Sequence, residues 1–176
     1  MGNVLAVISK EVRSYFGSPI AYVMIAVYLF CCGFLFRNFV LAFHQQSLTF
    51  QPQFAGAQPV NANDLVITPF FGIRYFIWVV VVPMLTMRLY AEEKKSGTIE
   101  LLMTSPITTW QTLLGKFAAC LGLYTVMEAI GFLLLVLLSG YCEIDWGPVA
   151  SGYLATFLLG AALISFGVLA SSVTDN

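Results

Sequence analysis

Four long apolar stretches constrain this chain more than any other feature, because each is long enough to cross a lipid bilayer. A transmembrane helix needs about 20 mostly apolar residues. Charged residues make up only 10% of the 176 residues and hydrophobic residues 59%, whereas a soluble domain carries about 25% charged residues. The sequence therefore predicts an all-α membrane protein and excludes a soluble enzyme. The expected polytopic helical bundle has four transmembrane helices, over approximately residues 19–43, 69–90, 110–138 and 148–173.

The positions of lysine and arginine predict the orientation of these helices. With a cytoplasmic N-terminus, six basic residues fall on the inner side, and only Arg37 and Arg74 fall toward the outer side. Cytoplasmic segments of membrane proteins are enriched in positive charge, so we expect the N-terminus to be cytoplasmic. The net charge of −1 leaves no basic excess for nucleic acid, which is not an expected partner. The six inner residues are Lys10, Arg13, Arg88, Lys94, Lys95 and Lys116.

Residues 3–17 carry the pattern of an amphipathic helix. Apolar residues such as Leu5, Ile8 and Val12 share one helical face, while Lys10 and Arg13 lie on the other. Such a helix is typical of the membrane interface, although a cytoplasmic extension of the first span would also fit. After the first span, residues 44–67 are rich in Gln, Pro and Asn and predict an irregular outer loop.

The segment 92–105, between the second and third spans, predicts a short cytoplasmic helix. A mixed-charge run leads into a Ser-Gly-Thr turn, and an apolar segment follows it up to Pro106. So short a helix is unstable alone and needs a surface to order it. The residues leave two surfaces open: another protein, which would make this a docking helix, or the membrane itself.

Several residues in this segment and just after it match a known pattern, which comprises Glu92, Glu93, Gly97, Thr98, Glu100, Leu101, Leu102, Pro106, Gly115 and Lys116. With them the chain resembles the permease subunit of ABC-2 type transporters. The stretch at residues 15–22 also resembles the start of the gliding-motility-associated permease group. The resemblance covers nearly the whole chain, as one transmembrane permease domain over residues 1–176.

The resemblance implies the membrane-spanning subunit of an ATP-driven exporter in the bacterial inner membrane. Relatives have six spans, so we expect a C-terminally truncated chain. The implied partners are a separate ABC-type ATPase, which binds the ATP, a second copy of the permease or a paralogous permease, and the lipid bilayer. The segment 92–105 would be the coupling helix that meets the ATPase. The implied contact residues are Glu92, Glu93, Gly97, Thr98, Ile99, Glu100, Leu102 and Met103.

The chain has no ATP-binding motif of its own. Gly115 and Lys116 are followed by Phe117, and no glycine stands five residues before Gly115, so the pair is not part of a phosphate-binding loop. We therefore expect ATP to bind on a partner subunit. The cysteines, with Cys31 next to Cys32 and no C-x-x-C pair, do not match a metal site, so we expect no enzyme activity, no cofactor and no metal in this chain.

Glu128 lies well inside the third span, where a carboxylate costs at least about 2.5 kcal/mol. It either contacts substrate or a proton in the bundle interior, or is protonated and bonded to a neighbouring helix. Arg37 and Arg74 either guide an anionic substrate or extend to the interface, which is commoner. These three residues are the candidates for a substrate pathway. An ion- or proton-coupled carrier that uses Glu128, and a non-transporting membrane anchor for a complex, are the alternative functions.

Small residues recur on one face of the fourth span. Gly152, Thr156 and Gly160 are spaced four apart, and such spacing lets helix backbones approach closely in a membrane. We expect this face to pack against another helix.

Overall fold

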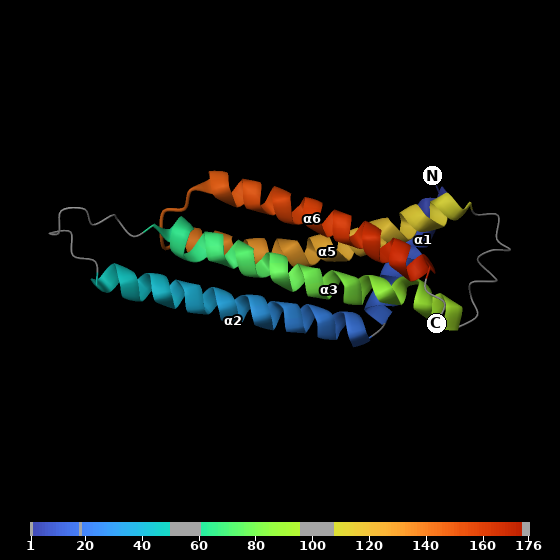
Figure 1. Ribbon diagram of the computed structural model, residues 1–176, viewed down its shortest axis with the longest axis horizontal. Helices are drawn as coiled ribbons and strands as arrows, with labels where there is room; N and C mark the ends of the chain where they lie inside the picture. Colours follow the sequence, from blue (N-terminus) through green and yellow to red (C-terminus); the bar gives the residue numbers. More distant parts are fainter. Residues whose placement is uncertain (1, 18, 50–60, 96–107, 174–176) are drawn as a thin grey trace.

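The computed structural model describes residues 2–17, 19–49, 61–95 and 108–173, and these are helical except for short turns. No strand occurs within those ranges, and the predicted all-helical fold is confirmed. A π-helical turn, η1, continues directly into α3 (Figure 1). The elements are α1 (Gly2–Gly17), α2 (Pro19–Thr49), η1 (Asn63–Ile67), α3 (Thr68–Lys95), α5 (Thr109–Ser139) and α6 (Trp146–Val173).

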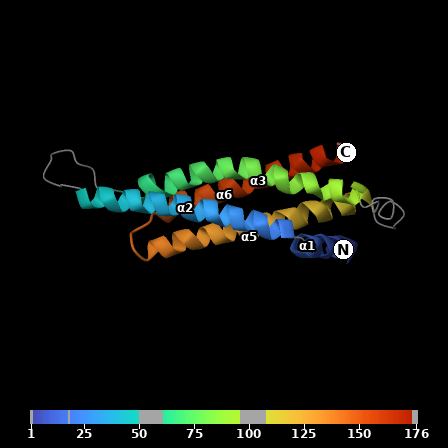
Figure 2. The same ribbon diagram turned by 90° about the horizontal axis from the view of Figure 1, so that it is seen from below.

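Four of these helices are long and apolar enough to cross a membrane, which confirms the predicted number. They run lengthwise beside one another, and α1 lies at the end of the bundle where the chain begins (Figures 1 and 2). Large apolar side chains such as Phe30 and Phe76 point outward, 73% and 72% exposed, as expected where lipid replaces water. The four segments are Ala21–Thr49, Asn63–Met87, Trp110–Ser139 and Trp146–Ser171.

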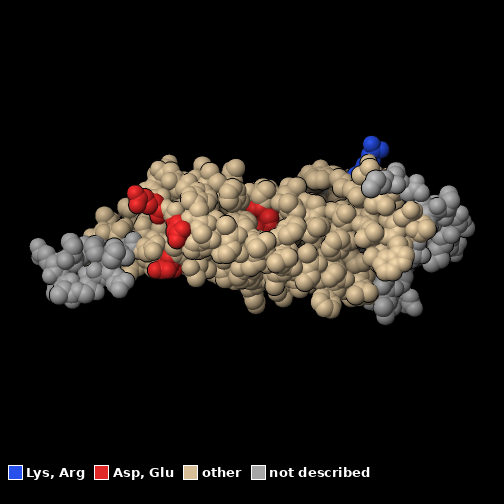
Figure 3. All heavy atoms as spheres, turned by 90° about the horizontal axis from the view of Figure 1, so that it is seen from above, with Lys and Arg blue, Asp and Glu red and all other residues tan. Residues whose placement is uncertain are grey.

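Charged side chains lie mainly at the two ends of the bundle. On the face in Figure 3, acidic atoms gather toward one end and basic atoms lie near the other. Asp64 in η1 and the α5–α6 turn residues Glu143 and Asp145 are exposed, as are Lys10 and Arg13 of α1. The long middle section is therefore suited to a hydrocarbon environment.

The helix α1 packs on the first half of α5 (Figure 2). Val7 is buried against α5, and a Cβ atom on Gly115 would come within 2.5 Å of the Cγ1 atom of Val7. Next to this contact, Lys116 Nζ donates to Glu11 Oε1 over 3.1 Å, and both residues are buried. Leu5 is 65% exposed. Part of the apolar surface of α1 is therefore buried against α5, and part of it remains open.

The second spanning helix begins earlier than the sequence predicted. The predicted irregular segment, residues 44–67, is too long at its first end because α2 continues to Thr49, and at its second end a helical turn is already present from Asn63. The Asn63 side chain explains the difference: its Nδ2 atom donates to the carbonyl of Asp145, and its Oδ1 atom accepts from the Asp145 amide, each over 3.2 Å. This reciprocal pair fixes the start of the helix against the α5–α6 turn.

The core is rich in aromatic rings, and glycines of α6 lie against it. The Trp78 ring lies 4.5 Å from that of Tyr28 and 4.4 Å from that of Tyr124, centroid to centroid, which joins α2, α3 and α5. A Cβ atom on Gly152 would come within 2.8 Å of Phe71, and one on Gly160 within 2.3 Å of Tyr124. The small-residue face of α6 therefore packs closely on the bundle, as the spacing predicted.

Candidate functional site

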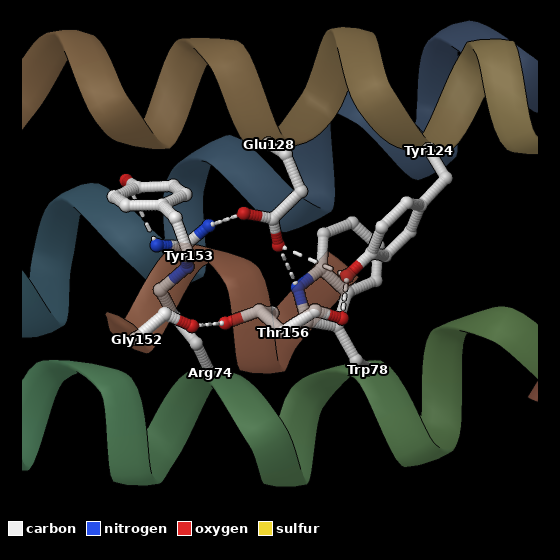
Figure 4. A network of polar contacts seen from close by, with 7 residues as sticks. All are labelled: Arg74, Trp78, Tyr124, Glu128, Gly152, Tyr153 and Thr156. Carbon is white, nitrogen blue, oxygen red and sulfur yellow. Dashed lines mark hydrogen bonds and ion pairs between the residues drawn. The ribbon is translucent and has the colours of Figure 1, made fainter. Parts of the chain in front are cut away.

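A buried ion pair lies in the middle of the bundle. Arg74 of α3 donates from Nη2 to Glu128 Oε2 of α5, and their side chains are only 1% and 7% exposed (Figure 4). Each charge alone would be costly to bury, but together they form a neutral pair. Gly131 makes room for the guanidinium group, because a Cβ atom there would lie 3.0 Å from Nη2.

Further donors surround the carboxylate of Glu128. Trp78 Nε1 donates to Oε1 over 2.5 Å, and Tyr124 Oη lies 3.3 Å from the same oxygen. The Tyr124 hydroxyl has one proton, and the carbonyl of Thr156 accepts it at the shorter distance of 2.7 Å. Arg74 and Trp78 are therefore the principal donors to Glu128, while Tyr124 ties α5 to α6 (Figure 4).

Aromatic rings enclose the guanidinium of Arg74. Its Nη1 atom donates to Tyr153 Oη over 2.9 Å, and its Cζ atom lies 4.9, 5.2 and 5.5 Å from the ring centroids of Tyr153, Phe70 and Phe71. Such distances allow cation–π attraction, which is stronger away from water. The Nε atom of Arg74 has no partner among the described residues. The network joins α3, α5 and α6 through one cation and one anion.

The structure brings two of the three predicted pathway residues together. Arg74 and Glu128 are paired, whereas Arg37 is exposed on α2. The expectation that Arg74 extends to the interface is wrong, because Glu128 compensates its charge inside the bundle. Glu92 and Glu93 lie within α3, but their side chains are not described. The other predicted coupling residues, Gly97, Thr98, Ile99, Glu100, Leu102 and Met103, lie outside the described residues.

Sequence reasoning missed most partners of the ion pair. Trp78 follows Arg74 by four residues and Tyr124 precedes Glu128 by four, so each shares a helical face with its charged neighbour. That spacing could have identified both. Tyr153 carries no such signal, since its helix has no ionisable neighbour within the span. Where side chains are described, no group of three or more His, Cys, Asp or Glu residues could hold a metal ion.

Comparison with known proteins identifies the family. The profile of the ABC-2 family transporter protein matches residues 5–176. The probable multidrug ABC transporter permease YbhR of Escherichia coli K12, and that of Escherichia coli O157:H7, are each 33% identical to this chain over 86 residues. The match covers 49% of this chain but only 23% of each relative, and no solved structure matches. The chain belongs to the ABC-2 family of transporter proteins.

Proposed function

We propose that this protein is the membrane-spanning subunit of an ATP-driven exporter and that a separate ABC-type ATPase supplies its energy. Its family and its similarity to permeases described as probable multidrug ABC transporters support this proposal. The lack of a phosphate-binding loop around Gly115 is consistent with ATP hydrolysis on another subunit. A second copy or a paralogous permease would complete the membrane part.

The distribution of charge supports an orientation with the N-terminus in the cytoplasm. Lys10 and Arg13 are exposed on α1, whereas Asp64 of η1 and Glu143 and Asp145 of the α5–α6 turn are exposed, and these two elements lie at the opposite end of the bundle from α1 (Figure 1). Positive charge favours the cytoplasmic side. In this orientation the connection between α3 and α5 is on the cytoplasmic side, where an ATPase can reach it. The family favours the bacterial inner membrane as the location.

The buried contact between Glu11 and Lys116 is the observation that carries the proposal. The described part of α5 begins just after the predicted coupling segment, with a capping box in which Thr108 and Gln111 bond reciprocally over 3.4 and 3.2 Å. Two turns further, Lys116 pairs with Glu11 of α1. A force on the coupling segment would therefore move α5 and α1 together, and this is the mechanical link that an ATP-driven permease requires.

The Arg74–Glu128 pair favours the exporter over a proton-coupled carrier. A carrier that protonates Glu128 in each cycle would leave Arg74 as an uncompensated buried charge, and breaking a buried pair costs about 3–5 kcal/mol. In an exporter the pair can stay intact and join the moving helices. The pathway role of Glu128, Arg74 and Arg37 is part of this proposal.

Co-purification with the ATPase tests the proposal. The tagged protein is purified in mild detergent and the ATPase retained per permease is quantified. We expect Glu100→Lys and Gly97→Pro to reduce the retained ATPase at least fivefold while circular dichroism shows unchanged helix content. Glu143→Lys makes the same charge reversal at the opposite end and should retain the ATPase fully. Equal retention by all three variants, or the absence of any co-purifying ATPase, would argue instead for a membrane anchor.

A further inference from the structure

A groove of about 470 Å³ lies between α5 and α6, beside the buried ion pair. Each helix contributes four residues at the same helical spacing, so one face of α5 and one face of α6 form its two walls. The volume lies within the range of about 300–1,000 Å³ that is usual for small-molecule sites. The lining residues are Thr125, Glu128, Ala129 and Phe132 of α5, and Ala150, Tyr153, Leu154 and Phe157 of α6.

Small residues open the groove and aromatic rings border it. Ala129 on α5 and Ala150 on α6 are exposed, and their short side chains leave the space unfilled. Phe132 and Tyr153 meet edge to face, with centroids 5.3 Å apart, and Phe157 is 39% exposed. Aromatic walls of this kind favour flat apolar ligands, because rings pack well edge to face or in offset stacks.

The charge balance of the groove selects an uncharged ligand. Glu128 is the one charged residue in the lining, and Arg74 already compensates it. A charged ligand would bring a further charge without a counter-ion into the middle of the span, which is costly. On the face in Figure 3, the middle section of the molecule shows no basic atoms, and acidic atoms are visible there in one recess.

Glu128 can still accept a hydrogen bond from a ligand. The two carboxylate oxygens offer about four lone-pair sites, and the described contacts are with Arg74, Trp78 and Tyr124. Thr125 is the hydroxyl residue of the α5 wall, and it donates its proton to the carbonyl of Leu121 over 2.7 Å. The groove therefore offers hydrogen-bond acceptors to a ligand that carries a donor.

We propose that this groove binds an uncharged aromatic molecule that carries a single N–H or O–H donor and enters from the lipid phase. The donor would bond to Glu128 while the rings lie against Phe132 and Phe157. The proposal names a substrate class for the exporter and so rests on the proposed function. Binding can nevertheless be measured without ATPase or nucleotide, so a failure of binding and a failure of coupling are distinguishable.

The probe is N-phenyl-1-naphthylamine, an uncharged fluorescent molecule with one N–H donor. The full-length protein is reconstituted into lipid nanodiscs, and fluorescence is titrated against empty nanodiscs to isolate the saturable component. Two matched analogues need no mutation: the N-methyl derivative lacks the donor, and 8-anilino-1-naphthalenesulfonate adds a negative charge. We expect the N-methyl derivative to bind at least fivefold more weakly and the sulfonate not to compete.

Variants that fill the groove leave the ion pair untouched. Ala129→Phe and Ala150→Phe should each weaken binding at least tenfold. Ala155→Phe makes the same change at an exposed position of α6 outside the lining and should alter affinity less than twofold. Circular dichroism and size-exclusion profiles check that each variant folds.

Several results would overturn the proposal. The probe could show no saturable binding, or both filling variants could bind it unchanged. Equal binding of the N-methyl derivative would indicate a groove for acyl chains, and equal competition by the sulfonate would contradict the charge argument. If the filling variants instead separate an assembly into single copies, the groove is an interface between two copies of the chain.

Discussion

The Arg74–Glu128 pair can be tested by removing its charges one at a time and then together. In Arg74→Met, the carboxylate of Glu128 stays buried, with a side chain only 7% exposed, and keeps Trp78 as its principal donor. In Glu128→Gln, the guanidinium stays buried without its counter-ion. Breaking one side of a buried pair costs about 3–5 kcal/mol, so we expect each single variant to lose that much free energy of unfolding.

The double variant should be more stable than either single one. Independent effects would add up to about 6–10 kcal/mol, but Arg74→Met with Glu128→Gln leaves no buried charge. The glutamine oxygen still accepts from Trp78, and methionine fills much of the space of arginine. The double variant loses the bond from Arg74 to Tyr153, worth about 1 kcal/mol, and the cation–π contacts of the guanidinium, worth about 2 kcal/mol. We therefore expect a coupling free energy of at least about 3 kcal/mol.

Reversible unfolding in mixed micelles, driven by increasing sodium dodecyl sulfate, measures these differences. Helix content is followed by circular dichroism and the environment of the three tryptophans by fluorescence. Arg37→Met is the matched control, because Arg37 is exposed on α2 and surface changes stay within about 0.5 kcal/mol. If the double variant loses as much stability as the two singles combined, the two charges are not coupled and the argument for a neutral buried pair fails.

Three further predictions concern packing, docking and orientation. Gly160→Ala would place a Cβ atom within 2.3 Å of a tyrosine ring and should cost about 1–3 kcal/mol in the same unfolding assay. Gly122→Ala, where the added atom meets nothing within 4 Å, should cost nothing, and an equal loss in both would contradict the close approach. Glu11→Lys should lower the melting temperature and the amount of ATPase retained, and adding Lys116→Glu to the same chain should restore both. If the double variant is no better than Glu11→Lys alone, the contact between α1 and α5 does not depend on this ion pair. Burial raises the pKa of the Cys142 thiol above its usual range, and this lowers the thiolate fraction at neutral pH. A membrane-impermeant maleimide added to whole cells should therefore label Cys142 slowly at pH 7 and faster as the pH rises. Cys142→Ser should abolish this labelling, and labelling only from the cytoplasmic side would reverse the proposed orientation.

The helices were predictable because they depend on local properties. Length and hydropathy are enough to identify a span, and the capping box at Thr108 and Gln111 lies at the predicted start of the third one. The close packing of α6 also followed from the spacing of Gly152 and Gly160, although its partners Phe71 and Tyr124 did not.

The ion pairs were not predictable from one sequence. Arg74 and Glu128 are 54 residues apart, and Glu11 and Lys116 are 105 apart. Helical periodicity tells which residues share a face of one helix, but not how two helices are rotated toward each other. The cost of burying a charge identified Glu128 as an unusual residue. Its partner Arg74 could not be identified, because the pairing depends on how α3 and α5 are rotated toward each other.

The second spanning helix started earlier than predicted for a related reason. Asn63 looked like a loop residue, because asparagine favours turns. Its amide instead bonds to the backbone of Asp145, 82 residues away in the sequence, and a helical turn forms where local propensity predicted none.

That asparagine has a consequence for how the bundle can move. At one end of the bundle, Asn63 bonds the start of the second spanning helix to the turn before α6. At the other end, Ser171 Oγ of α6 donates to the carbonyl of Met87 in α3 over 3.3 Å. Near the middle of the bundle, hydrogen bonds at Tyr124 and Glu128, which lie one turn apart, join α5 to these two helices. A tilt of α5 by only 5° about this contact would displace the far ends of the 31-residue helix by about 2 Å each way.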